Sequence, residues 1–394
     1  MAWRSDVEIL TQHLTVPFDY PVVFDTDILN PANPALADAV DRLREGRCHR
    51  LLAVTEAGLL RSWPDLGTRL AAYVLRHADR LELVGDLEVL PAGEAAKQGW
   101  DGAFQVMRWI LARNLDRQSV VLALGGGGLL DAAGLAAALV HRGLRLVRVP
   151  TTVLAQNDVG VGVKNGIDLD GVKNLIGVFA PPFAVLVDHD FLATLPDREW
   201  RGGAAEAFKV ALLKDAAFFD FLCREAGAVR RRDAEVMRHL VRRCAELHLE
   251  HIRTGGDPFE MGSERPLDFG HWSAHQLEML SQHAVRHGEA VAIGIALDTT
   301  YAAQAGWVTP AVRDALLRGL TECGLAIWHP LLETRGAAGP LLILDGLKRF
   351  REHLGGCLTL TFPDGVGRRR EEHAMDPVAI AASAAFLRNW QTKK

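Results

Sequence analysis

The stretch LALGGGGLLDAAG, Leu122 to Gly134, joins an apolar strand-like run to a helical pattern through four successive glycines. Glycine lets backbone N–H groups approach a phosphate closely, and the start of a helix adds a favourable dipole. The pattern is not the GxGxxG fingerprint, and a tight structural turn explains it equally well on its own. The stretch therefore predicts one strand–turn–helix unit and leaves its ligand open.

Outward from this stretch, strand-like runs alternate with helical patterns up to about residue 195. Such alternation predicts a parallel sheet with crossover helices. The expected strands are residues 20–24, 51–55, 80–84, 120–124, 144–149 and 183–187, and the expected helices are residues 66–77, 100–114 and 130–141. The fold class is therefore α/β, with a Rossmann-like N-terminal part.

Two further loops follow strands of this expected sheet. Pro150 to Thr152 ends one strand with two hydroxyls, and PAGEAAK, residues 91–97, offers a carboxylate and an ammonium. Ligands of open parallel sheets bind at the carboxyl ends of the strands, where these loops and the glycines would gather. A dinucleotide is the expected occupant.

From residue 199 onward the periodicity is mostly helical. The expected helices are residues 204–213, 234–251, 271–284, 288–304, 310–323, 340–353 and 377–389, with one strand at 357–362. A chain of 394 residues exceeds what a single core usually supports. We therefore expect two domains, residues 1–195 and 196–394, and a mobile surface loop at 254–266.

The stretch LDFGHWSAHQLEMLSQHAVRHGE, Leu267 to Glu289, holds three histidines that one divalent metal could collect. His271 and His275 share a helical face, and His287 begins the next apolar segment. Glu206, in GGAAEAFK, supplies a distant carboxylate. Histidine and carboxylate ligands are typical of a catalytic zinc site, and they also accept cobalt. A set of polar core histidines is the alternative.

Residues 156–177, QNDVGVGVKNGIDLDGVKNLIG, show neither helical nor strand periodicity. Lys164 and Lys173 lie among glycines there, and lysine binds phosphate as a point charge. Lys209, one turn after Glu206, adds a cation on the same helical face. A plain surface loop is the alternative interpretation.

Composition argues against several classes of partner. The net charge is -5, and no basic cluster with interleaved aromatics is present, so we expect no nucleic-acid surface. No run is long and apolar enough to span a bilayer, and the first residues lack a signal-peptide core, so we expect no membrane contact. Five scattered cysteines without CxxC spacing are typical of reduced thiols. We expect a cytoplasmic protein.

The ordered series GGGG..D, RG, PTT..AQ.D, VG.K.G, KN..G, TLP.RE, G.AE..K, FGH...H and HGEAVA.G resembles the 3-dehydroquinate synthase-like sugar phosphate cyclases. The resemblance implies an NAD-binding α/β domain, a helical metal-binding domain and a homodimer. It implies zinc ligands Glu206, His271 and His287. It implies an NAD site of Glu56, Glu94, Lys97, Gly126, Gly127, Gly128, Asp131, Thr151, Thr152, Phe191 and Thr194. It implies substrate contacts from Asp158, Lys164, Lys173, Asn174, Lys209 and His275, with Arg142 reaching the neighbouring subunit's substrate phosphate.

The chemistry that the resemblance implies is a cyclisation without net oxidation. Transient oxidation of a sugar phosphate by NAD precedes loss of phosphate, and reduction and an intramolecular aldol addition then close a carbocycle. The implied enzyme is a carbon–oxygen lyase.

Departures from the family pattern bear on the substrate. Family members that act on a carboxylate substrate hold it with a lysine and an arginine, and these positions are His248 and Glu264 here, with Arg265 displaced by one residue. Glutamate in place of arginine exchanges attraction for repulsion. Asp268 replaces an asparagine, and His353 lies near a lysine position. These changes resemble the sedoheptulose 7-phosphate cyclases, the group of 2-epi-5-epi-valiolone synthase, whose substrate lacks a carboxylate.

Alternatives remain open at this point. Retention of His275 departs from the valiolone-type pattern, so the chain resembles a divergent branch. A 3-dehydroquinate synthase proper is one alternative, and a metal-dependent NAD polyol dehydrogenase, which shares the two-domain plan, is another. An inert relative used as a scaffold is the last, although the implied ligands and Lys164 are all present.

Overall fold

The computed structural model describes residues 9–260, 266–336, 339–353 and 357–392. Its N-terminal part is a seven-stranded sheet in the order β1-β9-β6-β5-β2-β3, with β4 also paired to β2, and every pairing is parallel. The strands are β1 (Val22–Asp25), β2 (His49–Glu56), β3 (Leu81–Leu83), β4 (Glu88–Leu90), β5 (Val120–Gly125), β6 (Arg145–Pro150) and β9 (Ala184–Asp188). The predicted parallel sheet is confirmed.

Helices cover both faces of this sheet because side chains alternate along each strand. Leu51 and Leu122 pack with the first helices of the chain on one face, and Leu52 and Val121 pack with later helices on the other. The first group is α1 (Ala35–Val40), α2 (Ala57–Ser62) and α3 (Leu66–Arg76); the second is α4 (Asp101–Ala112) and α5 (Gly127–Leu139).

Residues 156–177, which show neither helical nor strand periodicity in the sequence, nevertheless form regular structure. A short π-helical turn, η3 (Ala155–Val159), leads into an antiparallel hairpin of β7 (Lys164–Leu169) and β8 (Val172–Phe179). Successive residues 165–168 are all buried, so β7 lacks the alternation that signals a strand. The pairing arises from tertiary packing against α5, which a local pattern does not reveal.

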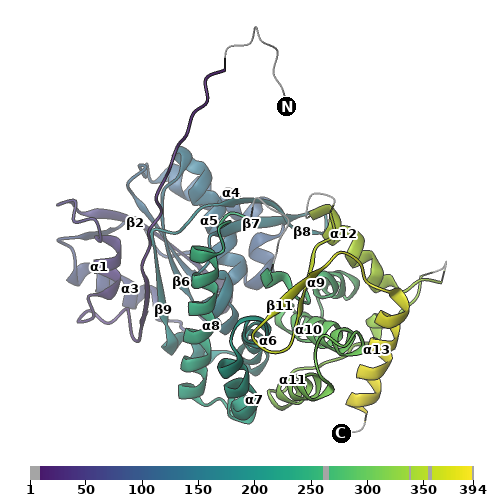
Figure 1. Cartoon of the computed structure of the whole chain (residues 1–394). Helices are drawn as coiled ribbons and strands as arrows, with labels where there is room; N and C mark the ends of the chain where they lie inside the picture. Colours follow the sequence, from purple (N-terminus) through teal and green to yellow (C-terminus); the bar gives the residue numbers. More distant parts are fainter. Residues whose placement is uncertain (1–8, 261–265, 337–338, 354–356, 393–394) are drawn as a thin grey trace.

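The rest of the chain is mainly helical, and Figure 1 shows helices α9 to α13 on the side away from α1 and α3. The helices are α6 (Asp197–Lys214), α7 (Ala216–Arg230), α8 (Ala234–Thr254), α9 (His271–Leu280), α10 (His287–Gln304), α11 (Pro310–Glu322), α12 (Asp345–His353) and α13 (Pro377–Gln391). A small hairpin joins β10 (Leu360–Pro363) to β11 (Arg369–Glu372). Helix α10 lies at the centre and contacts α6, α9, α11 and α13.

The helical predictions need three corrections. Helix α7 was not expected, because only Asp215 separates it from α6 and caps its first turn. The helix expected at 340–353 begins at Asp345, after a 3-10 turn, and the strand expected at 357–362 is β10. The helix expected at 271–284 ends at Leu280, because Gln282 and His283 adopt left-handed backbone angles.

One core cluster includes residues of β9 and of the helices, such as Val185, Phe208 and Leu240. The sheet and the helical layer are therefore packed together, and a boundary at residue 195 stays a prediction. Residues 261–265 of the expected mobile loop, with Glu264 and Arg265, lie outside the described residues.

Candidate active site

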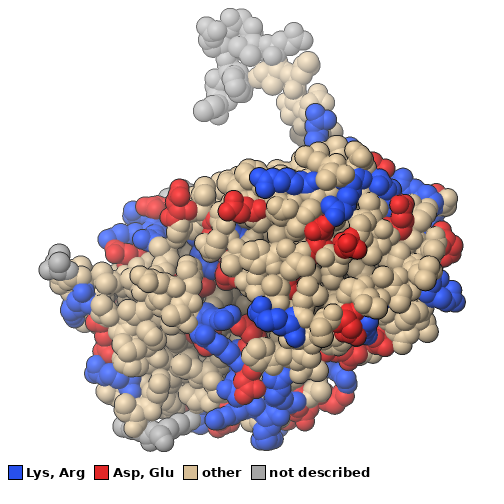
Figure 2. Space-filling model, turned by 180° about the vertical axis from the view of Figure 1, so that it is seen from behind, with Lys and Arg blue, Asp and Glu red and all other residues tan. Residues whose placement is uncertain are grey.

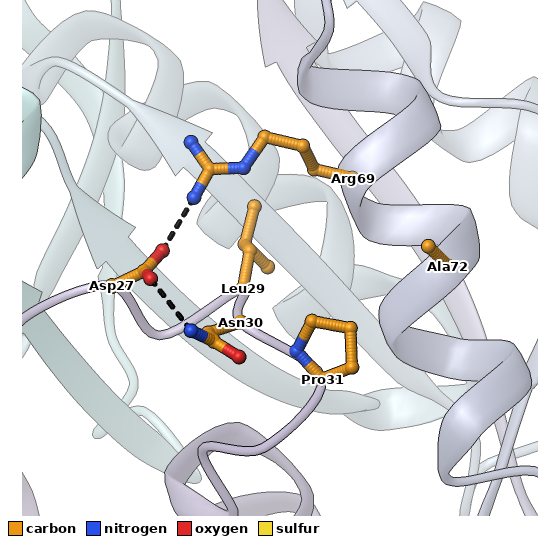
Figure 3. Close-up of a pocket in the computed structure, with 6 residues that line it drawn as sticks. All are labelled: Asp27, Leu29, Asn30, Pro31, Arg69 and Ala72. Carbon is orange, nitrogen blue, oxygen red and sulfur yellow. Dashed lines mark hydrogen bonds and ion pairs between the residues drawn. The ribbon is translucent and has the colours of Figure 1, made fainter.

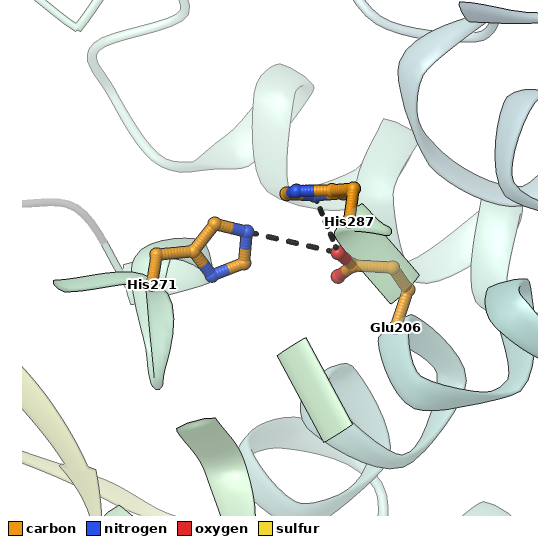
Figure 4. A group of neighbouring side chains, drawn as sticks. All are labelled: Glu206, His271 and His287. Atoms are coloured by element: carbon orange, nitrogen blue, oxygen red, sulfur yellow. Dashed lines mark ion pairs between the residues drawn. The ribbon is translucent and has the colours of Figure 1, made fainter. Parts of the chain in front are cut away.

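Three side chains from three helices meet at one buried point (Figure 4). The Oε1 atom of Glu206 lies 3.6 Å from Nε2 of His271 and 3.5 Å from Nε2 of His287. Donor atoms of a tetrahedral zinc site stand roughly 3.4 Å apart, given bonds of about 2.1 Å. Glu206 is fully buried, and its Oε1, which faces both histidines, accepts no hydrogen bond from the described residues. The geometry therefore fits one divalent metal ion.

Two glycine contacts allow the three helices to approach so closely. A Cβ on Gly288, next to His287, would lie 2.4 Å from the carbonyl oxygen of Gly202 on α6. A Cβ on Gly294 would lie 2.2 Å from the carbonyl oxygen of Gly270, next to His271. Both separations are shorter than carbon and oxygen tolerate, so these positions require glycine. The backbone contacts of α6, α9 and α10 thus place the three side chains.

Lys209 compensates the buried charge of Glu206. Its Nζ lies 2.5 Å from Oε2 of Glu206, and the lysine is itself buried. Burial opposes ionisation of Glu206, but Lys209 and the two histidines outweigh it and hold the pKa of this carboxyl well below its usual range. Glu206 is therefore an ionised potential ligand.

Glu278 belongs to the site and was not expected from the sequence. Its Oε2 lies 3.0 Å from Nδ1 of His287, and its Oε1 lies 3.2 Å from Nζ of Lys173. A carboxylate on the second nitrogen of a ligand histidine fixes the orientation and tautomer of the ring. Glu278 follows His271 by seven residues and His275 by three, so helical spacing could have indicated it.

His275 joins the cluster without joining the first triad. Its ring lies 5.3 Å from the ring of His271 and 5.9 Å from that of His287. It forms a second group of potential ligands with Glu278 and His287. Burial, followed by the two neighbouring histidines, lowers the pKa of His275 to about 3, so its imidazole is neutral near pH 7.

An ionic chain leads from this cluster to the sheet. Lys173 lies 2.6 Å from Glu94, and buried Lys97 bonds at 2.9 Å to both Asp131 and Asn174. Lys97 also lies 3.9 Å from Glu94. The structure therefore brings these five predicted residues together.

Glu56 organises the glycine turn that follows β5. Its carboxylate accepts hydrogen bonds from the backbone N–H of Gly126 at 2.7 Å and of Gly93 at 2.6 Å. Gly128 has a packing role as well, because a Cβ there would lie 2.6 Å from the carbonyl oxygen of Gly93. Gly127 opens α5 beside Gly128. The turn is thus held by a carboxylate from the neighbouring strand.

The remaining predicted dinucleotide residues lie at the same edge of the sheet. The N–H of Thr151 donates to Gly125, and the hydroxyl of Thr152 accepts from the N–H of Ala155. Phe191 packs against Trp63, whose indole N–H donates to the hydroxyl of Thr194 at 2.9 Å. Trp63 follows α2 and was not singled out in the sequence.

The loop and hairpin residues face a second set of charges. Asp158 lies 3.0 Å from His248, and Lys164 lies 2.6 Å from Glu260. Asp268 is close enough to Lys164 for the lysine, against the effect of burial, to keep the pKa of Asp268 below its usual range. Acidic groups therefore outnumber basic ones among these five side chains.

Asp158 should make the fold sensitive to acid. Burial would raise its pKa, but His248 and then Lys209 lower it to about 2. A carboxyl whose pKa is lower in the folded state stabilises the fold above its unfolded pKa, and this stabilisation is lost as the pH falls through the folded value. When the pH is lowered from 5 to 3, the free energy of unfolding should fall in both proteins. The fall should be about 1 kcal/mol smaller in Asp158→Asn than in the original chain. Urea unfolding at both pH values measures this, and equal losses would contradict it.

Two predicted residues are not placed in this cluster. Arg142 lies after α5 with a left-handed backbone and lines a separate cavity of about 880 Å³. That cavity is also lined by Ile110, Leu111, Asn114, Leu115, Asp116, Arg117, Leu139 and His141. His353 is the last residue of α12, and its side chain lies outside the described part of the structure.

A smaller cavity of about 260 Å³ lies beyond the end of β1, and Figure 3 shows the side chains that line it. Arg69 forms an ion pair there with Asp27, which also accepts a hydrogen bond from Asn30. No predicted site residue lines this cavity.

The surface seen in Figure 2 carries basic and acidic side chains in mixture. Among the described helices, none has the length and apolar character needed to cross a membrane. All five cysteines are free thiols.

The fold and site together define a class: a parallel sheet of the dinucleotide-binding type, joined to helices that present a His–His–Glu metal cluster. The 3-dehydroquinate synthase N-terminal family model matches residues 87–202, and the C-terminal model matches residues 203–341. The chain belongs to this family, the 3-dehydroquinate synthase-like sugar phosphate cyclases, which are phosphate-eliminating lyases. The predicted resemblance, fold class and enzyme class are confirmed.

Individual relatives support this membership. A 2-epi-5-epi-valiolone synthase of Actinomyces sp. is 32% identical over 395 residues, 98% of this chain and 97% of that protein. A 3-dehydroquinate synthase of Cereibacter sphaeroides is 42% identical over 240 residues, 60% of this chain and 64% of that protein. A solved structure is also similar: ValA, a 2-epi-5-epi-valiolone synthase from Streptomyces hygroscopicus subsp. jinggangensis 5008, with NAD+ and Zn2+ bound. The two structures match over 97% of this chain and 100% of the ValA chain, with 32% sequence identity and a TM-score of 0.85.

Proposed function

We propose that the protein is an NAD- and zinc-dependent cyclase of a sugar phosphate that lacks a carboxylate. The observation that carries the substrate class is the pairing of His248 with Asp158 at 3.0 Å. His248 occupies the position at which family members with a carboxylate substrate have a lysine. Its imidazole is engaged by a carboxylate, and Asp268 and Glu260 add negative charge around Lys164. These acidic side chains would repel a carboxylate on the substrate, whereas the hydroxyls of a sugar can donate hydrogen bonds to them.

The donor set fits the metal. Glu206, His271 and His287 would hold zinc or cobalt, with Glu278 orienting His287. Bound there, zinc supplies polarisation of a substrate hydroxyl.

The position of the glycine turn fits NAD. Strands β2 and β5 are neighbours in the sheet. After β2 the chain moves outward to β3, and after β5 it moves in the opposite direction to β6, so the order of strands reverses between β2 and β5. Ligands of open sheets bind at this reversal, and Glu56 and Gly126 lie there. Glu94, Lys97, Asp131, Thr151, Thr152, Phe191 and Thr194 would line the rest of the site, with Gly127 and Gly128 at the start of α5. NAD supplies a reversible hydride transfer when bound.

The chain's own side chains would bind the phosphate and the hydroxyls of the substrate. Lys164 and Lys173 carry the positive charge needed to bind a substrate phosphate. The neutral imidazole of His275 can donate or accept a hydrogen bond at the substrate. Asn174, Asp158 and Lys209 would orient substrate hydroxyls. Arg142 would act on a partner's site only in a homodimer, which we propose along with a cytoplasmic location.

One assay separates the candidate functions. Purified chain with zinc and NAD would be incubated separately with sedoheptulose 7-phosphate and with 3-deoxy-arabino-heptulosonate 7-phosphate, while released phosphate and NADH absorbance are followed. We expect phosphate from sedoheptulose 7-phosphate alone and no accumulation of NADH. Turnover of the carboxylate-bearing substrate alone would instead identify a 3-dehydroquinate synthase, which the 42% identity to the Cereibacter protein favours. Net NADH formation from polyols would identify a dehydrogenase.

A further inference from the structure

Asp298 is a buried carboxylate behind the metal cluster. It lies on α10 with 1% of its surface exposed. Its oxygens accept hydrogen bonds from the indole N–H of Trp272, at 3.0 and 3.2 Å, and from the backbone N–H of Gly270, at 3.1 Å. These two donors flank His271 in the sequence. Asp298 therefore bonds to both neighbours of a proposed zinc ligand without touching the ligand itself.

The arrangement carries an energetic cost. Within the described ranges no ion pair links Asp298 to a basic side chain, and a buried carboxylate without a cation is unfavourable. Burial raises the pKa of Asp298 to about 7, against the two hydrogen bonds that lower it. An apolar residue would fill the same volume without the cost of burying a charge. What the carboxylate contributes instead is the pair of hydrogen bonds to Gly270 and Trp272.

The backbone around His271 shows what those bonds hold. Gly270 has a left-handed φ of 78°, and a Cβ there would lie 2.7 Å from the backbone nitrogen of Ile295. Helix α9 therefore begins with its backbone pressed against α10. Asp298 is one turn beyond Gly294, on the face of α10 that meets this contact. Its carboxylate bonds to α9 through the residue before His271 and through the residue after it. The Nδ1 of His271 faces the carbonyl of Phe269 at 3.2 Å, and its Nε2 is directed to Glu206.

We propose that Asp298 is a positioning residue of the metal centre, which fixes the direction of His271 by holding Gly270 and Trp272 in place. This inference rests on the proposed function of the Glu206–His271–His287 cluster as a metal site.

Zinc affinity of the metal-free full-length chain tests the proposal. The dissociation constant would be measured by competition with a chromophoric chelator, after circular dichroism has shown that each variant is folded. Asp298→Leu should bind zinc about 10- to 100-fold more weakly than the original chain, as for other residues that orient metal ligands. Asp298→Asn, which keeps one oxygen acceptor, should recover most of this loss.

The matched control is Thr300→Val on the same helix. The Thr300 hydroxyl is buried and donates to Ala296 within α10 at 2.8 Å, so its loss should leave the zinc dissociation constant unchanged. If Asp298→Leu were less stable but bound zinc as tightly as the original chain, Asp298 would be merely structural and the proposal would fail.

A second variant applies if Asp298→Leu does not fold. Trp272→Phe removes one of the two donors and keeps an aromatic ring, and we expect a severalfold weaker affinity. Unchanged affinity in Trp272→Phe would overturn the proposal. Failure of the original chain to bind zinc would instead overturn the proposed function, so the two failures are distinguishable.

Discussion

Replacement of Glu206 with glutamine is expected to abolish tight zinc binding and to lower cyclase activity by roughly a thousandfold or more. The carboxylate is the one anionic member of the triad, and the amide that replaces it is a weak metal ligand. Chelator competition measures the first effect, and phosphate release under saturating zinc measures the second.

Glu289→Gln is the matched control for this variant. Glu289 lies two residues from His287 but bonds outward to Arg198 at 2.6 Å and caps the start of α10. Its neutralisation should leave zinc affinity within a factor of about two or three, because it removes only a surface ion pair. If both variants lost zinc equally, Glu206 would not be acting as a ligand.

Arg148→Met should strongly destabilise the fold. The guanidinium is fully buried on β6 and donates to the carbonyl groups of Val159, Gly160, Gly162 and Lys164, and to the side chain of Asn165 at 2.6 Å. Methionine would fill part of the volume and leave these acceptors unsatisfied. Loss of charged hydrogen bonds of this kind should cost about 3 kcal/mol or more of unfolding free energy.

The same variant should also lower activity, because the segment that Arg148 holds carries Asp158 at one end and Lys164 at the other. Arg145→Met, on the same strand, is the control: Arg145 pairs with Glu45 near the surface, and its loss should cost about 1 kcal/mol or less. Urea unfolding compares the two variants. Similar losses would show that the buried hydrogen bonds contribute little.

The sheet could be predicted because its signal is local. Strands such as β2 and β5 are continuous apolar runs that are buried on both faces, and helices with their own periodicity separate them. The proposed metal triad was predicted from the ordered motifs, which resemble a known family. The helical spacing of His271 and His275 indicated the region of the site, although His275 lies outside the triad. The residues that could not be predicted have roles that arise from contacts far apart in sequence.

Arg148 and Asp298 illustrate this limit. Each lies within an apolar run, and the neighbouring residues do not indicate what the polar group meets. Arg148 finds its acceptors up to 17 residues later, and Asp298 bonds to donors 26 and 28 residues earlier. The hairpin of β7 and β8 was missed for a similar reason, since its first strand is buried on successive residues rather than alternate ones. Glu278 alone had a usable signal, its helical spacing from His271.

The ion pair between Lys209 and Glu206 has a consequence for reactivity. Because the ammonium of Lys209 already offsets the carboxylate of Glu206, this pair of side chains carries almost no net charge before any cation arrives. An incoming divalent ion then keeps nearly its whole double charge instead of having half of it cancelled. Such a centre would be strongly electrophilic, and it would lower the pKa of a substrate hydroxyl held by Glu206, His271 and His287 through the ion.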